Sequence, residues 1–407
     1  MNCTHLEKFF IHNIGTSYGC TEPGAIGYNI SYAGKYLKNI KDLNIEIDKL
    51  TYKNAFNAGI PNGKDFKGTK WALIFGFYIG NPELKLEIFN DLKNIDILKM
   101  KYISKKINYN LKIVEKDDLY IKTKTTDSEG NSVEVLTYKS HDNIIYLDVN
   151  GEIKINKKND LNKNTGMEKD FLRKYYDHDN WEVCIEKMYE SKNVKELIDE
   201  IIKTNMEVFH AGKKYFKNLN DFGLGGAVFS RMNGDFIKVY TCYGSGNKGL
   251  SASIPVINYA NKLNVPIDKK RKAVLLSLLV TMLVTEIFGA ISTVCGVVYG
   301  AGAGILAGFL YLENITNHFD EAYNIYISGV GGSFCDGAKG SCAAKAITAV
   351  STAVNTLGII KQEFFFDHRD GYLGSNFYET INNLYRYNKS MKLFDSKTID
   401  ILDGKNC

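Results

Sequence analysis

The amino-acid sequence predicts an α+β protein, with a mainly helical core domain and a smaller α+β domain that contains an antiparallel sheet. Two observations lead to this division. Residues 84–160 are rich in Lys, Asp, Ile and Tyr and contain short stretches that alternate between apolar and polar side chains, as half-buried strands do. From Gly223 onward the composition shifts to Ala, Gly, Val, Leu and Ser, in long stretches typical of buried helices. We therefore expect an N-terminal segment over 1–80, an α+β domain over 81–222 and a helical domain over 223–407.

The N-terminal segment is expected to be partly helical. A short helical pattern around Leu6 and Phe10 precedes a turn, and a second helix is predicted over Glu22–Leu37. Thr21 can cap this helix, and Glu22 and Pro23 suit its first turn. The chain then looks extended from Ile45 to Phe56 and turns at residues 59–63, where Gly, Pro and Asn cluster.

The middle region predicts an antiparallel meander with one or two helices. Four stretches alternate in polarity, at 111–114, 119–124, 133–138 and 144–149. Turn-forming residues separate them at 127–131 and 140–143. The following residues, 168–217, look helical and polar.

The C-terminal region predicts five helices, at 248–263, 269–288, 295–311, 315–327 and 337–357. Residues 273–312 are apolar enough to suggest a membrane hairpin as an alternative. Glu286 lies within that stretch, glycines cluster after it and no aromatic belt flanks both ends, so we favour buried core helices.

Composition indicates an intracellular globular protein. Hydrophobic residues make up 44% and charged residues 24% of the 407 residues, and the net charge is +5. The basic residues form no stripe interleaved with aromatics, which argues against nucleic-acid binding. Eight cysteines are far too few for a disulfide scaffold of this length, and the N-terminus lacks a signal-peptide pattern. We expect a reducing cytoplasm, where cysteines more often bind metal or react.

Three of these cysteines, Cys295, Cys335 and Cys342, lie among glycines and small residues. On one continuous helix, Cys335 and Cys342 would be separated by about 10.5 Å of axial rise, which is far for ligands of one compact cluster. The glycines around them allow Cys335 to lie on a turn and Cys342 on the helix that follows. The three thiols are one short of a full set of iron–sulfur cluster ligands, but the spacing alone also allows buried core cysteines.

Cys20 lies in a separate motif, Gly-Cys-Thr-Glu-Pro-Gly, at residues 19–24. At the start of a helix, the dipole would lower the pKa of its thiol, and the thiolate could act as a base or nucleophile. A purely structural cysteine before a helix fits the same residues.

A third motif, residues 243–253, combines glycines with Ser245 and Asn247 before a predicted helix. Successive backbone N–H groups there could form an anion nest for a substrate carboxylate, with the two side chains adding hydrogen bonds. An ordinary capped loop is the alternative. Asn62, in the turn at residues 59–63, is a weaker candidate of the same kind.

Together these pieces resemble the L-cysteine desulfidase family, which is itself similar to the alpha domain of iron–sulfur L-serine dehydratases. The matching segments lie in the family's order and span nearly the whole chain, at residues 19–23, 59–62, 244–249, 295–298 and 335–339. The resemblance implies that Cys295, Cys335 and Cys342 hold a [4Fe-4S] cluster. It also implies that Cys20 accepts a proton and that Ser245, Asn247 and Asn62 contact the substrate. Gly24 departs from the alanine that relatives usually carry there.

The implied reaction is β-elimination of L-cysteine to hydrogen sulfide, ammonia and pyruvate. In this reading the substrate sulfur binds the iron that lacks a protein ligand, and Cys20 removes the α-proton. The N-terminal segment would thus bring Cys20 to a helical iron–sulfur catalytic domain over 223–407. L-Serine dehydratase activity follows nearly the same residue logic, and a non-catalytic iron–sulfur sensor is a further alternative. We expect L-cysteine as partner, no nucleic acid or membrane, and leave a homodimer open. Cys407 could also reach back to the open iron, although a frayed terminus is favoured.

Overall fold

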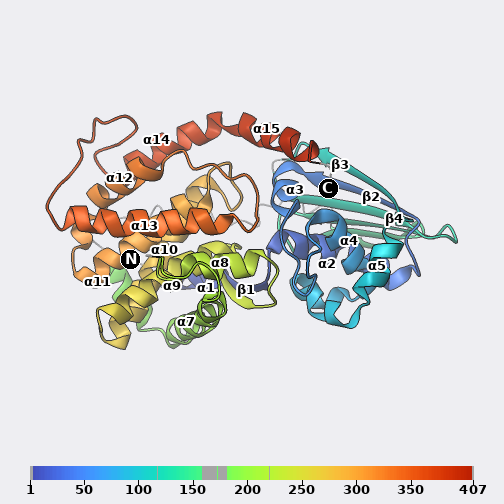
Figure 1. Cartoon of the computed structure of the whole chain (residues 1–407), viewed down its shortest axis with the longest axis horizontal. Coiled ribbons are helices and arrows are strands. Elements are labelled where there is room, and N and C mark those ends of the chain that lie inside the picture. Colours follow the sequence, from blue (N-terminus) through green and yellow to red (C-terminus); the bar gives the residue numbers. More distant parts are fainter. Residues whose placement is uncertain (1–2, 117, 158–171, 173–180, 220, 406–407) are drawn as a thin grey trace.

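The computed structural model describes residues 3–116, 118–157, 172, 181–219 and 221–405. It is an α+β structure with a helical domain on one side and a sheet covered by helices on the other (Figure 1). The predicted fold class is therefore confirmed.

The smaller domain is built on a six-stranded sheet in the order β3-β2-β4-β5-β6-β7. Its strands are β2 (Asp42–Asp48), β3 (Asn108–Val114), β4 (Tyr120–Thr126), β5 (Ser132–Tyr138), β6 (Ile144–Val149) and β7 (Glu152–Asn156). All neighbours pair antiparallel except β2 and β3, which are parallel. The four stretches predicted as strands thus correspond to β3, β4, β5 and β6.

Helices α2 (Thr21–Tyr36) and α4 (Gly68–Ile79) pack against each other and share an apolar core with this sheet. Asn29 fixes α2 on the sheet, because its buried amide donates to the Ile121 carbonyl and to Thr137 Oγ1. A buried polar group satisfied in this way also specifies register. The domain is completed by α3 (Lys49–Ala55), the 3₁₀ segment η1 (Pro82–Asn94) and α5 (Ile97–Ile103).

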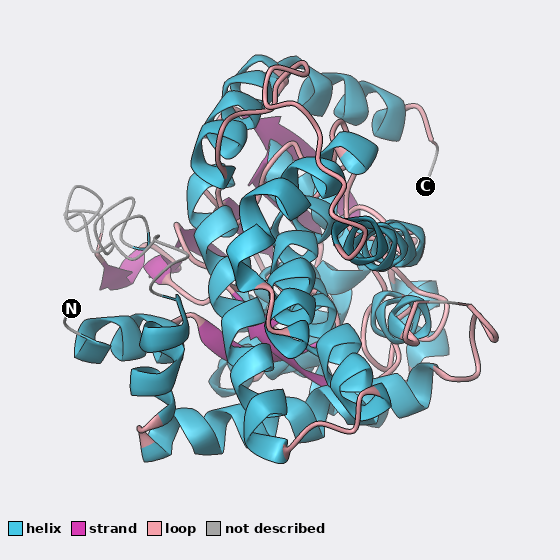
Figure 2. Cartoon of the chain, turned by 90° about the vertical axis from the view of Figure 1, so that its left-hand side faces the viewer, coloured by secondary structure: helices cyan, strands magenta, loops and turns pink. Residues whose placement is uncertain are grey.

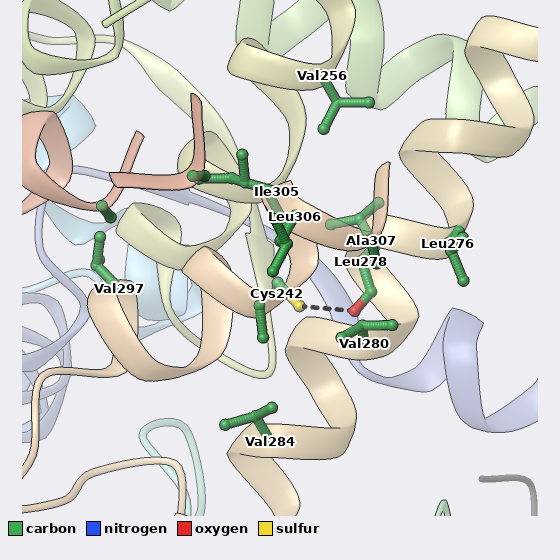
Figure 3. Close-up of a cluster of buried hydrophobic side chains, with 14 of the residues drawn as sticks. Cys242, Val256, Leu276, Leu278, Val280, Val284, Val297, Ile305, Leu306 and Ala307 are labelled. Carbon is green, nitrogen blue, oxygen red and sulfur yellow. Dashed lines mark hydrogen bonds between the residues drawn. The ribbon is translucent and has the colours of Figure 1, made fainter. Parts of the chain in front are cut away.

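The helical domain surrounds the larger apolar core, part of which is drawn in Figure 3. Its first elements are α1 (Cys3–His12), α6 (Trp181–Tyr189), α7 (Lys192–Gly212), α8 (Leu224–Met232), α9 (Gly246–Lys262) and α10 (Ile267–Phe288). Then come the π-helical turn η5 (Val297–Ala301), α11 (Gly302–Glu313), the 3₁₀ turn η6 (Thr316–His318), α12 (Phe319–Val330), α13 (Cys342–Ile360), α14 (Phe377–Ser390) and α15 (Lys392–Asp403). Strands β1 (Ile14–Tyr18) and β8 (Lys238–Cys242) form a separate antiparallel pair. Figure 2 shows how the helices of this domain crowd around one another.

The two domains of the structure do not divide the chain at the expected boundaries, residues 80 and 222. Strand β2 precedes residue 80 but lies inside the six-stranded sheet, and α6 and α7 precede residue 223 but pack in the helical domain. The expected extended segment from Ile45 to Phe56 is also wrong after Asp48. Asp48 caps a helix there, because its side chain accepts a hydrogen bond from the Thr51 backbone. Of the helical pattern expected over 168–217, residues 168–171 and 173–180 lie outside the described part.

The apolar stretch 273–312 forms most of α10 and α11, which pack against each other inside the larger core. Among the described residues, one helix, α13, is long and apolar enough to cross a membrane by length and composition. Core helices commonly pass the same test, and residues at regular intervals along α13 are buried in the core.

The last two helices return across the molecule. α14 packs on α12 in the helical domain, and α15 reaches the smaller domain and packs on α3 (Figure 1). The C-terminal segment therefore contacts both domains. Cys407 lies outside the described residues.

Candidate active site

A cavity of about 110 Å³ lies where the two domains meet. The smaller domain, with the start of α2, lines it with Cys20, Thr21, Glu22, Asn54 and His141. The helical domain lines it with Arg231, Tyr243, Gly244, Ser245, Asn247, Lys248, Cys295, Cys335 and Cys342. All four cysteines singled out from the sequence thus face one space. Ser245 and Asn247 face it as well.

Cys295 and Cys335 lie on two loops that are joined by backbone hydrogen bonds. The Cys295 amide donates to the Ser333 carbonyl at 2.9 Å, and the Cys335 amide donates to the Thr293 carbonyl at 2.5 Å. Val294 and Phe334 form an antiparallel bridge between these contacts. This short ladder places two cysteines, 40 positions apart in the sequence, side by side on the cavity wall.

Cys342 reaches the same cavity from the first turn of α13. The chain can approach it from Cys335 because Gly337 has a φ of +100°, a conformation that L side chains rarely adopt. A Cβ atom at Gly337 would also lie only 2.3 Å from the Lys53 carbonyl oxygen. The expected helix over 337–357 therefore begins later, at Cys342, and the predicted turn precedes it.

The donor set of three cysteines suits an iron–sulfur cluster. Burial, and after it the neighbouring Cys335, raises the pKa of the Cys295 thiol to about 12. Neighbouring thiolates at this site therefore repel each other unless a positively charged group, such as a metal centre, binds to them. No three His, Cys, Asp or Glu side chains of the described residues are grouped to hold a single metal ion. The three cysteines line one cavity, and thiolates are the ligands that iron–sulfur clusters use.

The N-terminus of α9 borders the cavity, as the predicted nest requires. Ser245 is its N-cap and accepts a hydrogen bond from the Lys248 backbone at 3.3 Å. Tyr243 and Gly244 precede it with φ values of 51° and 75°. A Cβ atom at Gly244 would meet nothing within 4 Å, so the backbone there is open to a ligand.

Two cations that the sequence reasoning missed lie beside this helix terminus. Arg231, at the end of α8, is 3% exposed and donates to Asn247 Oδ1 at 2.9 Å, while its Nε has no hydrogen-bond partner. Among the described residues no carboxylate forms an ion pair with Arg231 or Lys248. Burial lowers the pKa of Lys248 to about 8. A buried guanidinium without a carboxylate partner is costly unless an anion binds to it.

Cys20 is the N-cap of α2, but its electrostatics differ from the prediction. Its Sγ donates to Glu22 Oε2 at 2.8 Å. Burial raises the pKa of the Cys20 thiol well above its ordinary value, the Glu22 carboxylate raises it further, and Arg231 only partly opposes this. The expected lowering by the helix dipole is therefore wrong, because desolvation and a neighbouring negative charge outweigh it.

Asn62 is not brought to the cavity. Its side chain donates to the Phe89 carbonyl at 3.1 Å within the smaller domain, and its backbone φ of 61° suits the predicted turn. The geometry gives no support to the prediction that Asn62 contacts a substrate.

Glu22 and His141 are further lining residues that had not been singled out for chemistry. Glu22 was interpreted only as a first-turn residue of a helix. His141 lies in the turn between β5 and β6, which the sequence located without indicating that it faces the cysteines. Both residues belong to the smaller domain, and the packing of the two domains brings them to the same cavity as Cys295, Cys335 and Cys342.

Comparison with known proteins agrees with this geometry. Residues 103–399 match the family model described as serine dehydratase alpha chain. The chain belongs to this family. It is 30% identical over 409 residues to a UPF0597 protein of Fervidobacterium nodosum, covering 98% of this chain and 96% of that one. It is 28% identical over 410 residues to an L-cysteine desulfidase of Methanococcus maripaludis, covering 98% of both chains. No solved structure matches.

Membership of the serine dehydratase alpha chain family supports an iron–sulfur lyase as the general class. The family match ends at residue 399, within α15, and includes all three cysteines of the two loops and α13.

Proposed function

We propose that this protein is a [4Fe-4S]-dependent L-cysteine desulfidase that converts L-cysteine to hydrogen sulfide, ammonia and pyruvate. The observation that carries the proposal is that Cys295, Cys335 and Cys342 share one cavity with Cys20, from the other domain. The relative named L-cysteine desulfidase, which matches over the full length, supports the choice of substrate.

Cys295, Cys335 and Cys342 are the residues that would hold the cluster. When bound, such a cluster supplies an iron without a protein ligand, a Lewis acid that favours departure of the substrate's sulfur. The cationic side of the cavity, with Arg231 and Lys248, suits the negative charge of three thiolates and a substrate carboxylate.

The substrate carboxylate is assigned to the N-terminus of α9. The backbone at Gly244 is open to the cavity, and Arg231 lies near it through its hydrogen bond to Asn247. A guanidinium that lacks a carboxylate partner binds a carboxylate with charge-assisted hydrogen bonds. Ser245 and Asn247 then hold these groups in place, the first as helix cap and the second as acceptor from Arg231.

Cys20 is assigned to the α-proton, on the wall contributed by α2. In the elimination, the Cα–H and Cβ–S bonds break and a Cα–Cβ double bond forms, so the products are sulfide and aminoacrylate. Tautomerisation to the imine and hydrolysis by water give pyruvate and ammonia. The chain's own part is to orient the substrate and to accept one proton.

L-Serine dehydratase is the second candidate, because the matching family model carries that description. The chemistry differs only in the leaving group, which would be hydroxide. The experiment is anaerobic purification followed by measurement of pyruvate from each amino acid. We expect L-cysteine to be turned over faster, with one sulfide released for each pyruvate; equal or faster turnover of L-serine would reject the desulfidase assignment. No pyruvate from either substrate would reject both.

A further inference from the structure

The Glu22 carboxylate is buried in the cavity wall and surrounded by hydrogen-bond donors. It is 7% exposed. Oε2 accepts from Cys20 Sγ at 2.8 Å and from Thr21 Oγ1 at 3.2 Å, and Oε1 accepts from Asn54 Nδ2 at 2.9 Å. Three donors arranged around two oxygens favour the ionised carboxylate, which otherwise would be costly to bury.

We propose that Glu22 holds the negative charge that drives the elimination, and that Cys20 relays the proton to it. This inference rests on the proposed function. The Cys20 sulfur takes the α-proton while the thiol proton passes to Glu22 Oε2. One S–H and one Cα–H bond break, and one S–H and one O–H bond form. The electron pair of the Cα–H bond becomes the Cα–Cβ double bond, and the sulfur leaves with the pair of the Cβ–S bond.

The charges around Cys20 and Glu22 support these roles, with Cys20 as the proton relay and Glu22 as the ionised group. Burial and the Glu22 charge raise the pKa of Cys20, so free thiolate is scarce near neutral pH. Burial alone would raise the pKa of Glu22 as well. The charge of His141 and the hydrogen bonds from Cys20 and Asn54 outweigh that effect and hold this pKa below its ordinary value. Of the pair, the carboxylate is therefore the ionised member.

The other charged or titratable groups that interact electrostatically with Glu22 come from three other elements. They are His141 from the β5–β6 turn, Arg231 from α8 and Lys248 from α9. The Nε2 atom of His141 is buried without a hydrogen-bond partner, and the residue lines the cavity. Glu22 therefore faces positive charge from three other elements, which favours its ionised form. Glu22 is thus a positioning residue that acts through Cys20, without touching the substrate.

The test compares Glu22→Gln with Glu87→Gln in the cluster-loaded enzyme. Glu87 lies outside the cavity and, like Glu22, accepts a hydrogen bond from an asparagine amide. We expect Glu22→Gln to keep its iron and to lower kcat for L-cysteine at least about 100-fold, with Glu87→Gln unchanged. Alkylation of Cys20 by iodoacetamide, followed by peptide mass spectrometry, should become faster in Glu22→Gln because a charge that raises the thiol pKa is gone.

Slower turnover together with a more reactive thiol is the combination that a merely structural role of Glu22 would not produce. Unchanged kcat in Glu22→Gln, or slower alkylation of Cys20, would overturn the proposal. If this variant fails to keep iron, the wild-type pH profile decides. A relay to Glu22 predicts a flat kcat from pH 7 to 9, whereas free thiolate as the base predicts a rise approaching tenfold per unit and would overturn it. Absence of sulfide release by the wild type would instead reject the proposed function, and the alkylation measurement would still report on the Cys20–Glu22 pair.

Discussion

Lys53 and Asp395 form a buried ion pair that connects the two domains to both cysteine loops. Lys53 Nζ lies 2.6 Å from Asp395 Oδ1 and also donates to the Cys335 carbonyl at 2.9 Å. Asp395 Oδ2 accepts from Thr293 Oγ1 at 2.6 Å. The lysine comes from α3 and the aspartate from α15, so the C-terminal helix braces the segment next to Cys295 and the backbone of Cys335.

Breaking this pair should loosen the cysteine loops. Asp395→Asn leaves a fully buried lysine without its counter-charge, which typically costs about 3–5 kcal/mol. We expect a lower free energy of unfolding and loss of most of the iron during anaerobic desalting. Asp400→Asn, on the exposed side of the same helix, is the control and should change neither. Full iron retention by Asp395→Asn would show that the brace is not needed.

Replacing Arg231 should weaken binding more than chemistry. Arg231→Gln removes the cation assigned to the substrate carboxylate, and a charged hydrogen bond is worth about 1.5–3 kcal/mol, or roughly a 10- to 150-fold rise in KM. Steady-state kinetics with L-cysteine check this, with iron content measured in parallel. Arg271→Gln, which loses a surface pair with Asp199, should leave KM unchanged. An unaltered KM in Arg231→Gln would place the carboxylate elsewhere.

His141 should matter although it lies in a turn of the smaller domain. We expect His141→Gln to lower kcat about 10- to 100-fold while iron content stays the same, because the variant keeps a polar side chain but loses the positive charge that favours the Glu22 carboxylate. His210→Gln, on the exposed side of α7, serves as control. Wild-type kcat in His141→Gln would show that the imidazole does not help to keep Glu22 ionised.

Acid should weaken the protein partly through Glu22. Its folded-state pKa lies below the ordinary value of 4.5, so its contribution to the free energy of unfolding is complete above that pH and is lost as the pH falls through the folded-state value. Urea unfolding of the wild type and Glu22→Gln, both without cluster, should therefore differ more at pH 7 in favour of the wild type than at pH 3.5. A difference that does not change with pH would mean that Glu22 has the same pKa in both states.

Local sequence patterns predicted the elements whose signals are local. The helix expected over Glu22–Leu37 is α2, those expected over 248–263 and 269–288 are α9 and α10, and the alternating stretches are strands. Failures occurred where tertiary contacts decide. The segment after Asp48 is helical because of a cap, and the two-stranded pair of β1 and β8 joins residues more than 200 positions apart.

The candidate site shows the same division. Glycine-rich contexts pointed to Cys295, Cys335 and Cys342, and the capped helix start pointed to Ser245 and Asn247, all of which line the cavity. Arg231 and His141 carry no motif, and their roles depend on which other side chains surround them. The pKa of Cys20 could not be predicted either, because it follows from burial and from the orientation of the Glu22 side chain.

The cluster assignment is tested most directly by iron and sulfide content, measured beside sulfide release from L-cysteine. The wild type, Cys295→Ala and Cys242→Ala are reconstituted without oxygen and compared. Cys242 is also a buried free cysteine; it packs in the apolar core (Figure 3) and does not line the cavity. We predict that Cys295→Ala loses the cluster and sulfide release, while Cys242→Ala keeps both; a Cys295→Ala variant that retains wild-type iron and activity would contradict the account.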